Sequence, residues 1–279
     1  MRILITGGRG NLANIIKQEL GAKHEIECPT RLELNVLSLS NIQQYLNEQT
    51  FDILIHTAIV GGRRTKPETS DIVYQNLLMS ENLLLFADKF KMIINFDSAA
   101  IYDRSTDIFN RSEEDITTVP NDYYGFSKYL IHRRCQQFDN VYNLRIFNVF
   151  HENEEPDRFI KMCFTKKENK ENVTIFDNKY FDFVYKDDFI KVVQYYIEHA
   201  NETDSLHKTI NVCYPDKYKL SEIANMIVGD KSKIIIINEN TTRNYSGNGQ
   251  LLQSLNLDLI GLKKSLLTYS SYHNYTFEE

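Results

Sequence analysis

Short apolar runs alternate with amphipathic stretches along the first 150 residues. Continuous apolar runs predict strands covered on both faces, and apolar residues at helical spacing predict helices. The expected strands are 2–6, 24–28, 51–57, 92–96 and 142–149, and the expected helices are 14–20, 40–49 (with Ser40 as N-cap), 71–90 and 123–138. Strands separated by helices in this order predict βαβ crossovers, and hence an α/β fold with a Rossmann-like, doubly wound parallel sheet.

The pattern is less regular after residue 150. Charged stretches at 151–157 and 166–172 predict loops. The short elements expected among and after them are strands at 173–176, 182–185, 209–213 and 233–237 and helices at 187–200 and 220–228. The run Ile234–Ile237 predicts a buried strand. We therefore expect a first domain over residues 1–150 and a smaller α/β portion over 151–279, with some segments of the second part returning to the first sheet.

Composition narrows the class of protein. The chain has 279 residues, 42% of them hydrophobic and 25% charged, which is typical of globular proteins. A net charge of −6 argues against a nucleic-acid partner. No apolar run reaches the ~18 residues that span a bilayer, and the opening segment lacks the features of a signal peptide, so no membrane association is expected.

The cysteines and histidines point to no metal and no disulfide. The four cysteines are scattered without a CxxC pattern, which favours a reduced, cytoplasmic protein. None of the seven histidines lies in an HxxxH or HExxH pattern. We therefore expect no metal site.

A glycine-rich segment, TGGRGNLA, follows the first predicted strand. Gly7 permits a tight turn, Gly10 lets the backbone approach a diphosphate, and Ala13 allows the helix to pack closely on the strand. The first N–H groups of the helix, including those of Asn11 and Leu12, would face the phosphates with the positive end of the helix dipole. The pattern predicts dinucleotide binding by the first domain, although a tight strand–helix turn alone uses the same residue types.

The segment after the second predicted strand, ECPTRLELN, bears on the choice of dinucleotide. An acidic residue there commonly binds the ribose hydroxyls of NAD, and Glu27 is a candidate. Arg31, together with Arg9 in the glycine-rich segment, suits the additional phosphate of NADP instead. The two arginines favour NADP(H), with NAD(H) as the alternative and solvated arginines as a third reading.

A tyrosine and a lysine stand four residues apart in a predicted helix. Tyr124 and Lys128 would share one helix face. A neighbouring ammonium lowers the pKa of a phenol, which would make Tyr124 a proton donor or acceptor for a carbonyl. Ser98 ends the fourth predicted strand, at the sheet edge where α/β sites form, and could hydrogen-bond the same oxygen. The alternatives are an incidental surface pair and a serine that caps a helix.

Together, the glycine-rich segment, Ser98 and YGFSK resemble the extended short-chain dehydrogenase/reductase family of nucleotide-sugar epimerases, dehydratases and reductases. Further similar segments are HTA at 56–58, LRIFNVF at 144–150, FDFVYKDD at 181–188 and INV at 210–212. The resemblance implies that Ser98, Tyr124 and Lys128 are catalytic, that Ala58 and Lys128 also contact the cofactor, that Asn148 lies near the sugar and that Asn76 supports the site. It also implies a homodimer formed through the helices at 71–90 and 123–138, and a substrate-binding role for most of 151–279.

Within this family the GDP-L-fucose synthase branch is the most similar, through TRLELN, VGGRR and DIVYQNLLMSENLL. That branch implies a GDP-sugar substrate and NADPH. Its epimerising Cys and His correspond here to Ala100 and, in a loose alignment, Arg158. Neither residue exchanges protons with carbon acids at neutral pH. The Asp–Glu pair of the 4,6-dehydratases is replaced by Ala99 and Ala100.

One further departure concerns the diphosphate. The arginine of the family's RDFxxVDD segment is Phe181 here, which leaves Arg158 and Arg243 as candidates for binding the substrate diphosphate. Either arginine can also be read as a solvated surface residue.

The expected function is thus an NADPH-dependent C4 reductase of a nucleotide-activated 4-keto-6-deoxy sugar, lacking C3/C5 epimerisation. A C4 epimerase with tightly bound NAD and a non-enzymatic dinucleotide-sensing protein are the alternatives.

Overall fold

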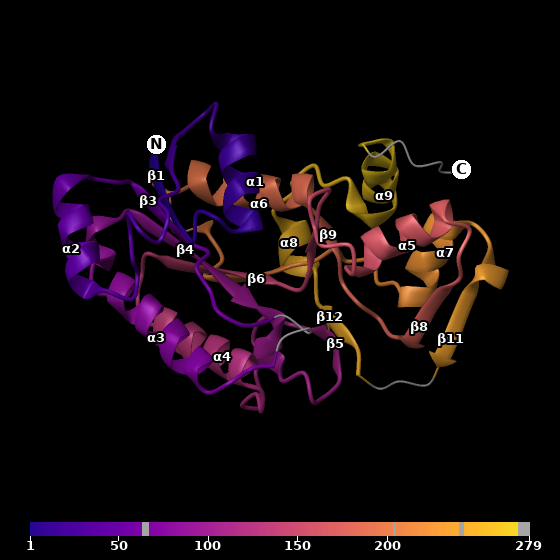
Figure 1. Cartoon of the computed structure of the whole chain (residues 1–279). Helices are drawn as coiled ribbons and strands as arrows, with labels where there is room; N and C mark the ends of the chain where they lie inside the picture. Colours follow the sequence, from indigo (N-terminus) through magenta and orange to yellow (C-terminus); the bar gives the residue numbers. More distant parts are fainter. Residues whose placement is uncertain (63–66, 203–204, 240–242, 273–279) are drawn as a thin grey trace. The chain divides into compact units, whose positions relative to one another are not determined.

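Parallel strands and helices alternate through the first of two structural units in the computed structural model (Figure 1), which describes residues 1–62, 67–202, 205–239 and 243–272. This unit comprises residues 1–104, 116–146 and 192–210. Its elements are β1 (Arg2–Thr6), α1 (Asn11–Leu20), β2 (Glu25–Glu27), α2 (Leu39–Glu48), β3 (Ile53–His56), α3 (Asp71–Leu84), the 3₁₀ helix η1 (Ala87–Lys89), β4 (Met92–Ser98), the 3₁₀ helix η2 (Ala99–Tyr102), α4 (Tyr123–Cys135), β6 (Val141–Ile146), the later part of α6 (Lys186–Glu198) and the start of β10 (Thr209–Val212).

The described residues form a sheet of six strands in the order β10-β6-β4-β3-β1-β2. The pairs β2–β1, β1–β3, β3–β4 and β4–β6 are parallel. The strand order reverses at β1, because β2 lies on one side of it and β3 on the other. In open α/β sheets, ligands bind beside the carboxyl ends of the strands at such a reversal. The Rossmann-like α/β fold expected from the sequence is confirmed.

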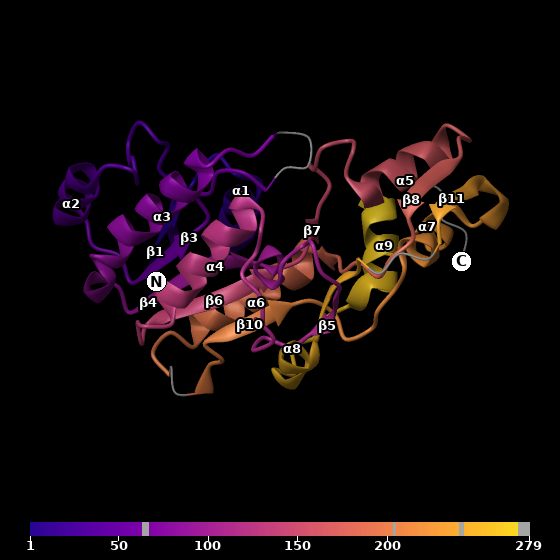
Figure 2. The same cartoon turned by 90° about the horizontal axis from the view of Figure 1, so that it is seen from below.

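Helices cover both faces of this sheet. Figures 1 and 2 show α3 and α4 side by side along one face, with α1 on the other. The strands are apolar throughout because both their faces are buried; β3, for example, has no exposed residue. One core cluster joins Leu54 of β3 to Met79 and Leu83 of α3 and to Ile131 of α4.

The second unit comprises residues 105–115, 147–191 and 211–279. Its elements are β5 (Ile108–Arg111), β7 (Val149–Phe150), α5 (Phe159–Glu168), β8 (Val173–Asp177), β9 (Val184–Tyr185), the start of α6, the end of β10, α7 (Leu220–Val228), the 3₁₀ helix η4 (Lys231–Lys233), β11 (Ile234–Asn238), β12 (Tyr245–Gly247), α8 (Gln250–Ser254) and α9 (Gly261–Tyr272). The strands pair in parallel as β8–β11, β5–β12 and β7–β9. Residues 192–210 follow residue 150 in the chain but belong to the first unit.

Several expected boundaries are wrong. The second helix begins at Leu39, and its N-cap is Ser38, whose Oγ accepts a hydrogen bond from Asn41 N; Ser40 lies inside the helix. The helix expected over 71–90 ends at Leu84, because the chain then tightens into 3₁₀ bonds such as Phe86 N to Leu83 O. Helix α5 occupies part of the stretch 166–172, which was expected to be a loop.

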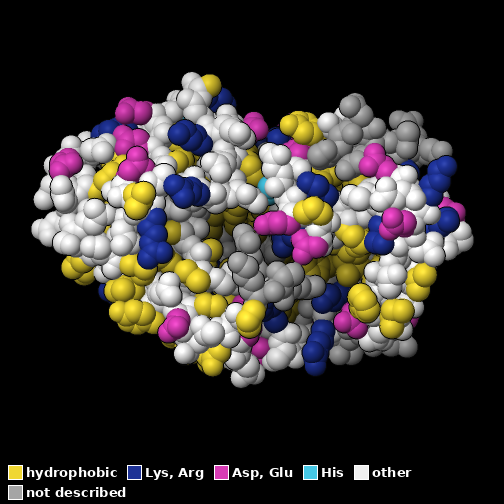
Figure 3. Space-filling view, viewed as in Figure 1, with side chains coloured by type: hydrophobic (Ala, Val, Ile, Leu, Met, Phe, Trp, Pro, Cys, Tyr) yellow, Lys and Arg dark blue, Asp and Glu magenta, His cyan; other side chains and the backbone are white. Residues whose placement is uncertain are grey.

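The strand β11 is not buried as expected. Among the described residues it forms a two-stranded sheet with β8, and none of its five residues is fully buried. Ile235 is 41% exposed and Ile237 63%, and Phe176 of β8 is 74% exposed on the same face. Figure 3 shows hydrophobic side chains at the surface over these strands. An apolar run was therefore a poor guide to burial here.

Among the described residues, no helix combines the length and the apolar character that crossing a lipid bilayer requires.

Candidate active site

The loop after β1 turns sharply against the segment after β3. Gly7 has φ +72°, and a Cβ there would lie 2.9 Å from the Ala58 Cα, so this position requires glycine. Gly10 donates its N–H to the Gly7 carbonyl oxygen at 2.8 Å and is the N-cap of α1. Ala13 is fully buried in α1. The tight turn into a helix is therefore present, and the positive end of the α1 dipole faces this loop.

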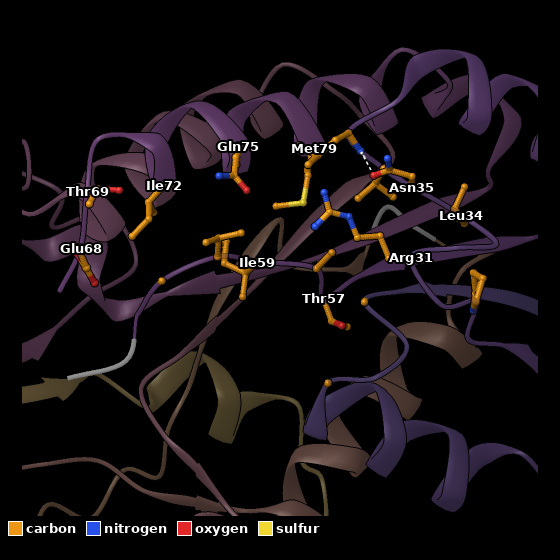
Figure 4. Close-up of a pocket in the computed structure, with 18 of the residues that line it drawn as sticks. Arg31, Leu34, Asn35, Thr57, Ile59, Glu68, Thr69, Ile72, Gln75 and Met79 are labelled. Carbon is orange, nitrogen blue, oxygen red and sulfur yellow. Dashed lines mark hydrogen bonds between the residues drawn. The ribbon is translucent and has the colours of Figure 1, made fainter. Parts of the chain in front are cut away.

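A cavity of about 680 Å³ opens beside this loop, within the first unit. It lies at the carboxyl ends of β1 and β3, where the strand order reverses. Figure 4 shows side chains from the segment after β2 and from α3 on its walls. Its lining includes Gly7, Gly10, Arg31, Ala58 and Met79. The volume, the glycine backbone and the dipole of α1 fit a dinucleotide.

Some of the residues expected to bind the cofactor line this cavity and others do not. Gly7, Gly10, Arg31 and Ala58 line it, while Arg9, Asn11, Leu12 and Ala13 are not among the described residues that do. Arg9 is exposed.

Glu27 and Arg31, the two candidates for recognising the cofactor ribose, have different surroundings in the structure. Glu27 Oε1 accepts a hydrogen bond from Arg2 Nη2 at 2.5 Å, and Oε2 accepts one from the Tyr45 hydroxyl at 3.0 Å. Glu27 is not among the described residues that line the cavity, whereas Arg31 is. In Figure 4 the Arg31 guanidinium extends towards Met79. An exposed cation, not a carboxylate, therefore occupies this end of the cavity.

Ser98 and Tyr124 meet at the carboxyl end of β4. Ser98 is buried, and its Oγ accepts a hydrogen bond from Ala100 N at 3.3 Å, which caps η2. The Ser98 side chain lies near enough to the Tyr124 phenol to lower the pKa of that phenol. Tyr124 lies in the first turn of α4, and Lys128 follows one turn later on the same helix. The fold therefore brings the three predicted catalytic residues to one strand end and the adjoining helix.

The expected effect of Lys128 on Tyr124 is wrong in this structure. Lys128 is buried and donates its Nζ hydrogen to the Phe96 carbonyl oxygen at 2.5 Å. The pKa of Tyr124 is raised above its ordinary value, chiefly by burial and further by the charges of Asp97 and Glu68; the Ser98 side chain and the Arg104 charge oppose this. Burial of the phenol, and not the ammonium one helical turn away, governs its pKa.

Asn76 connects the loop after β3 to α4. Its side chain exchanges two hydrogen bonds of 2.9 Å with the backbone of Val60 and donates a third to Ser127 Oγ at 3.1 Å. The Ser127 hydroxyl in turn donates to the Tyr124 carbonyl oxygen at 2.8 Å. Asn76 thus fixes the cavity wall relative to the helix that carries the tyrosine, in keeping with a supporting role.

A buried ionic network that was not predicted from the sequence lies behind Ser98. Asp97 Oδ2 accepts a hydrogen bond from Arg145 Nε at 2.9 Å and lies 3.1 Å from His132 Nδ1, and all three side chains are almost fully buried. The Arg145 Nη1 also donates to the Tyr102 hydroxyl at 2.5 Å. Although burial opposes ionisation, the Arg145 and His132 partners hold the pKa of Asp97 below its usual range. The available signal was an acidic residue directly after the predicted apolar strand 92–96.

In the second unit, two of the expected substrate residues contact each other. Arg158 Nη2 donates to Asn148 Oδ1 at 3.1 Å, and Arg158 Nε lies 3.8 Å from Glu154 Oε2. Glu154 is 4% exposed, its Oε1 has no hydrogen-bond partner among the described residues, and burial raises its pKa to about 7. An asparagine and an arginine are therefore held together as a polar pair with a buried carboxyl beside them.

The remaining expected substrate residue, Arg243, is exposed ahead of β12. Phe181, which stands at the position of the family's arginine, packs against the rings of Phe183 and Tyr245 with centroids 4.9 and 5.1 Å away. An aromatic cluster has thus replaced that cation. Arg63 and Arg64, part of the VGGRR resemblance, lie outside the described residues.

Comparisons with known proteins agree with this geometry. Residues 3–213 match the NAD dependent epimerase/dehydratase family. A GDP-L-fucose synthase from Azorhizobium caulinodans is 27% identical over 154 residues, 51% of this chain and 48% of that protein. A GDP-L-colitose synthase from Yersinia pseudotuberculosis is 28% identical over 145 residues, 49% of this chain and 47% of that protein. The chain thus matches about half the length of these curated relatives.

Solved structures share the fold over nearly the whole chain. A GDP-mannoheptose C4 reductase from Campylobacter jejuni with NADP bound has a TM-score of 0.81 at 19% identity, covering 98% of both chains. A dTDP-4-dehydrorhamnose reductase from Clostridium acetobutylicum has a TM-score of 0.81 at 18% identity, covering 98% of this chain and 100% of that one. With a glycine turn, a dinucleotide-sized cavity and a family match over most of its length, the chain belongs to the NAD-dependent epimerase/dehydratase family, a group of extended short-chain dehydrogenases/reductases.

Proposed function

We propose that the protein is an NADPH-dependent reductase that acts on C4 of a GDP-linked 4-keto-6-deoxy sugar and does not epimerise C3 or C5. The observation that carries the proposal is the meeting of Ser98 and the Tyr124 phenol at the carboxyl end of β4, where the Tyr124 ring lies against Gly61 and Gly62 of the loop after β3. Because the pKa of Tyr124 is raised, the phenol keeps its proton at neutral pH. A proton donor of this kind suits reduction of a carbonyl group.

Each catalytic residue has a separate part. Tyr124 donates its proton to the carbonyl oxygen as that oxygen becomes an alkoxide. Ser98 hydrogen-bonds the same oxygen and orients it. Lys128, whose Nζ donates to the Phe96 carbonyl oxygen, would hold the ribose next to the nicotinamide.

The cofactor is held in the cavity of the first unit. Gly7, Gly10 and Ala58 line this cavity and would allow the dinucleotide to approach the backbone closely. The N–H groups at the start of α1, those of Asn11, Leu12 and Ala13, follow directly after Gly10 and would bind the diphosphate. Arg31, assisted by Arg9, binds the 2′-phosphate, which favours NADPH over NADH. When bound, NADPH supplies the hydride that the carbonyl carbon receives.

The proposed substrate is inferred from three polar side chains and from the sugar nucleotides named for two relatives. Asn148, Arg158 and Arg243 bind the sugar and its diphosphate, and the GDP-sugar enzymes among the relatives favour a guanine nucleotide. Ala100 and Arg158 stand where epimerising enzymes of this branch use a cysteine and a histidine, so proton exchange at C3 and C5 lacks its acid and base. We further propose a cytoplasmic homodimer formed through α3 and α4.

The test is NADPH consumption with a panel of GDP- and dTDP-linked 4-keto-6-deoxy sugars, run in deuterated water. We expect turnover with at least one GDP-linked sugar and a product without deuterium at C3 or C5. Deuterium at either carbon would contradict the loss of epimerisation. Purified protein that carries NAD and interconverts C4 epimers without added NADPH would favour the epimerase instead, and binding of NADPH with no turnover on the panel would favour a dinucleotide sensor.

A further inference from the structure

Glu68 connects the cavity wall to the catalytic helix. Its Oε1 accepts a hydrogen bond from Gly62 N at 3.2 Å, and its Oε2 accepts one from Tyr124 N at 3.1 Å. Glu68 also lines the cavity, and Figure 4 shows it at one end of that wall. One carboxylate thus fixes both the loop after β3 and the first turn of α4.

Arg104 lies between this carboxylate and a second one. Its guanidinium donates through Nε and Nη2 to the two oxygens of Asp122, the first bond being 3.2 Å. Its Nη2 is 3.6 Å from Glu68 Oε1, and its Cζ is 5.7 Å from the centroid of the Tyr124 ring. Arg104 therefore contacts both carboxylates and lies over the ring that carries the reacting hydroxyl.

The carboxylates of Asp122 and Glu68 cap the N-terminus of α4. Asp122 Oδ1 accepts the Gly125 N–H at 2.7 Å, while Glu68 takes that of Tyr124. Carboxylates are favoured at a helix N-terminus, but two of them at the same turn repel each other. Arg104 offsets that repulsion and so allows both caps to persist.

The phenol ring is also confined sterically. Gly62 has φ +78°, and a Cβ there would lie 3.0 Å from Cε2 and Cζ of Tyr124. The Glu68 bond to Gly62 N therefore sets how closely this loop covers the ring. The loop belongs to the segment after β3 that walls the cavity, so the cavity and the ring share one support.

We propose that Glu68 and Arg104 are positioning residues that couple the cofactor cavity to the Tyr124 phenol, Glu68 by joining the cavity loop to α4 and Arg104 by holding the cluster together over the ring. This inference rests on the proposed function, in which Tyr124 is the proton donor. It adds a cation over the Tyr124 ring and a link between the cavity and the reacting group.

The electrostatic part of the inference gives opposite effects for the two residues. The charged groups that face the phenol are Asp97 from β4, Glu68 and Arg104, with the neutral Ser98 hydroxyl beside them. Arg104 lowers the pKa of Tyr124 and Glu68 raises it, within the larger effect of burial. Loss of the Arg104 charge must therefore raise the pKa of Tyr124, and loss of the Glu68 charge must lower it.

The first measurement is steady-state kinetics of Arg104→Met, Arg104→Lys and Glu68→Gln across pH, in the alcohol-oxidising direction, where ionised Tyr124 accepts the proton. We expect kcat to fall about tenfold in Arg104→Met and Glu68→Gln, because small misplacements of reacting groups are costly, with little change in KM for the sugar.

The pH dependence of the rate separates the two residues. The pH at which the rate reaches half its maximum should be higher than in wild type for Arg104→Met and lower for Glu68→Gln. Arg104→Lys keeps the positive charge and restores the wild-type pH dependence. The matched control is Arg133→Met, which removes a positive charge at an exposed position of α4, the helix that carries Tyr124. Unchanged kcat, or shifts in the same direction, overturns the proposal.

The second measurement is amide hydrogen exchange, which needs no substrate. Glu68→Gln should accelerate exchange in peptides that contain the Gly62 and Tyr124 amides, while peptides from α7 keep the wild-type rate. Unaltered exchange at both amides overturns the coupling. If wild-type protein turns over no sugar of the panel, the proposed function fails, and the exchange result by itself decides whether Glu68 joins the cavity loop to α4.

Discussion

The Tyr45 hydroxyl donates a hydrogen bond of 3.0 Å to Glu27, and Arg2 occupies the other oxygen of that carboxylate. The pKa of Tyr45 is raised to about 12, by burial and by the Glu27 hydrogen bond, so the phenol remains a donor. Glu27 is thereby committed to the packing of β2 against α2. Arg31 is left as the charged residue of this segment that lines the cavity.

Arg31→Ala should weaken NADPH binding about tenfold, since one exposed arginine–phosphate contact is removed. NADH, which lacks the 2′-phosphate, should bind Arg31→Ala and wild type alike. Fluorescence titration of both dinucleotides measures the two affinities. The control is Glu27→Gln, which should keep the wild-type preference. An equal loss of affinity for NADPH and NADH in Arg31→Ala would contradict the assignment.

Tyr124→Phe removes the proton donor and keeps the ring. Loss of a general acid lowers kcat by about 10²–10⁴-fold. The affinity for NADPH should stay within about twofold of wild type, because the hydroxyl is not proposed to bind the cofactor. Stopped-flow turnover and equilibrium titration measure the two quantities. Turnover near the wild-type rate would refute the catalytic role of Tyr124.

Gly62→Ala should lower both stability and kcat. A residue with Cβ at φ +78° costs about 1–2 kcal/mol, and here the new methyl group also meets the Tyr124 ring. Gly229→Ala is the matched control, because Gly229 has φ +79° and no atom within 4 Å of the added Cβ. Both variants should lose stability in urea, Gly62→Ala the more because of its contact with the ring, but only Gly62→Ala should lose activity. Equal kcat in the two variants would exclude an effect on the ring.

Arg145→Met should lower the free energy of unfolding by about 3–5 kcal/mol. The substitution leaves the buried Asp97 carboxylate without its main ionic partner. The double variant Asp97→Asn/Arg145→Met should recover part of the loss, because no uncompensated charge remains. Urea unfolding of the two variants and wild type measures this. A single variant as stable as wild type would show that the ion pair contributes nothing.

Glu154 should make stability fall as the pH rises. Burial raises its folded-state pKa to about 7, so between pH 4.5 and 7 the folded chain binds more protons at this carboxyl than the unfolded chain does. Stability from this group is therefore present below pH 4.5 and lost by pH 7, by roughly 3 kcal/mol at most at about 1.4 kcal/mol per pH unit.

Glu154→Gln should consequently gain stability over wild type at pH 8 and little at pH 4.5. Urea unfolding at both pH values checks the difference. A constant offset between the two proteins would mean that Glu154 ionises at its ordinary pKa.

The alternation of apolar runs and helical patterns was enough to predict the parallel sheet, because strands buried on both faces leave little choice of residue. The glycine-rich turn was equally clear, since the positive φ of Gly7 and its contact with Ala58 exclude side chains. The pattern was weaker beyond residue 150. There, Ile235 and Ile237 are apolar yet exposed, and α5, α8 and α9 were not anticipated.

The sequence by itself determined the fold class, the turn after β1 and the candidate residues of the proposed site. Tertiary structure alone decided the electrostatics of that site, because charge effects depend on distance and burial and not on spacing along the chain. In the folded chain Glu27 accepts a hydrogen bond from Tyr45 instead of lining the cavity. Lys128 donates to the Phe96 carbonyl oxygen, and Arg104 lies over the Tyr124 ring. These contacts join segments far apart in sequence, so no local pattern could have revealed them.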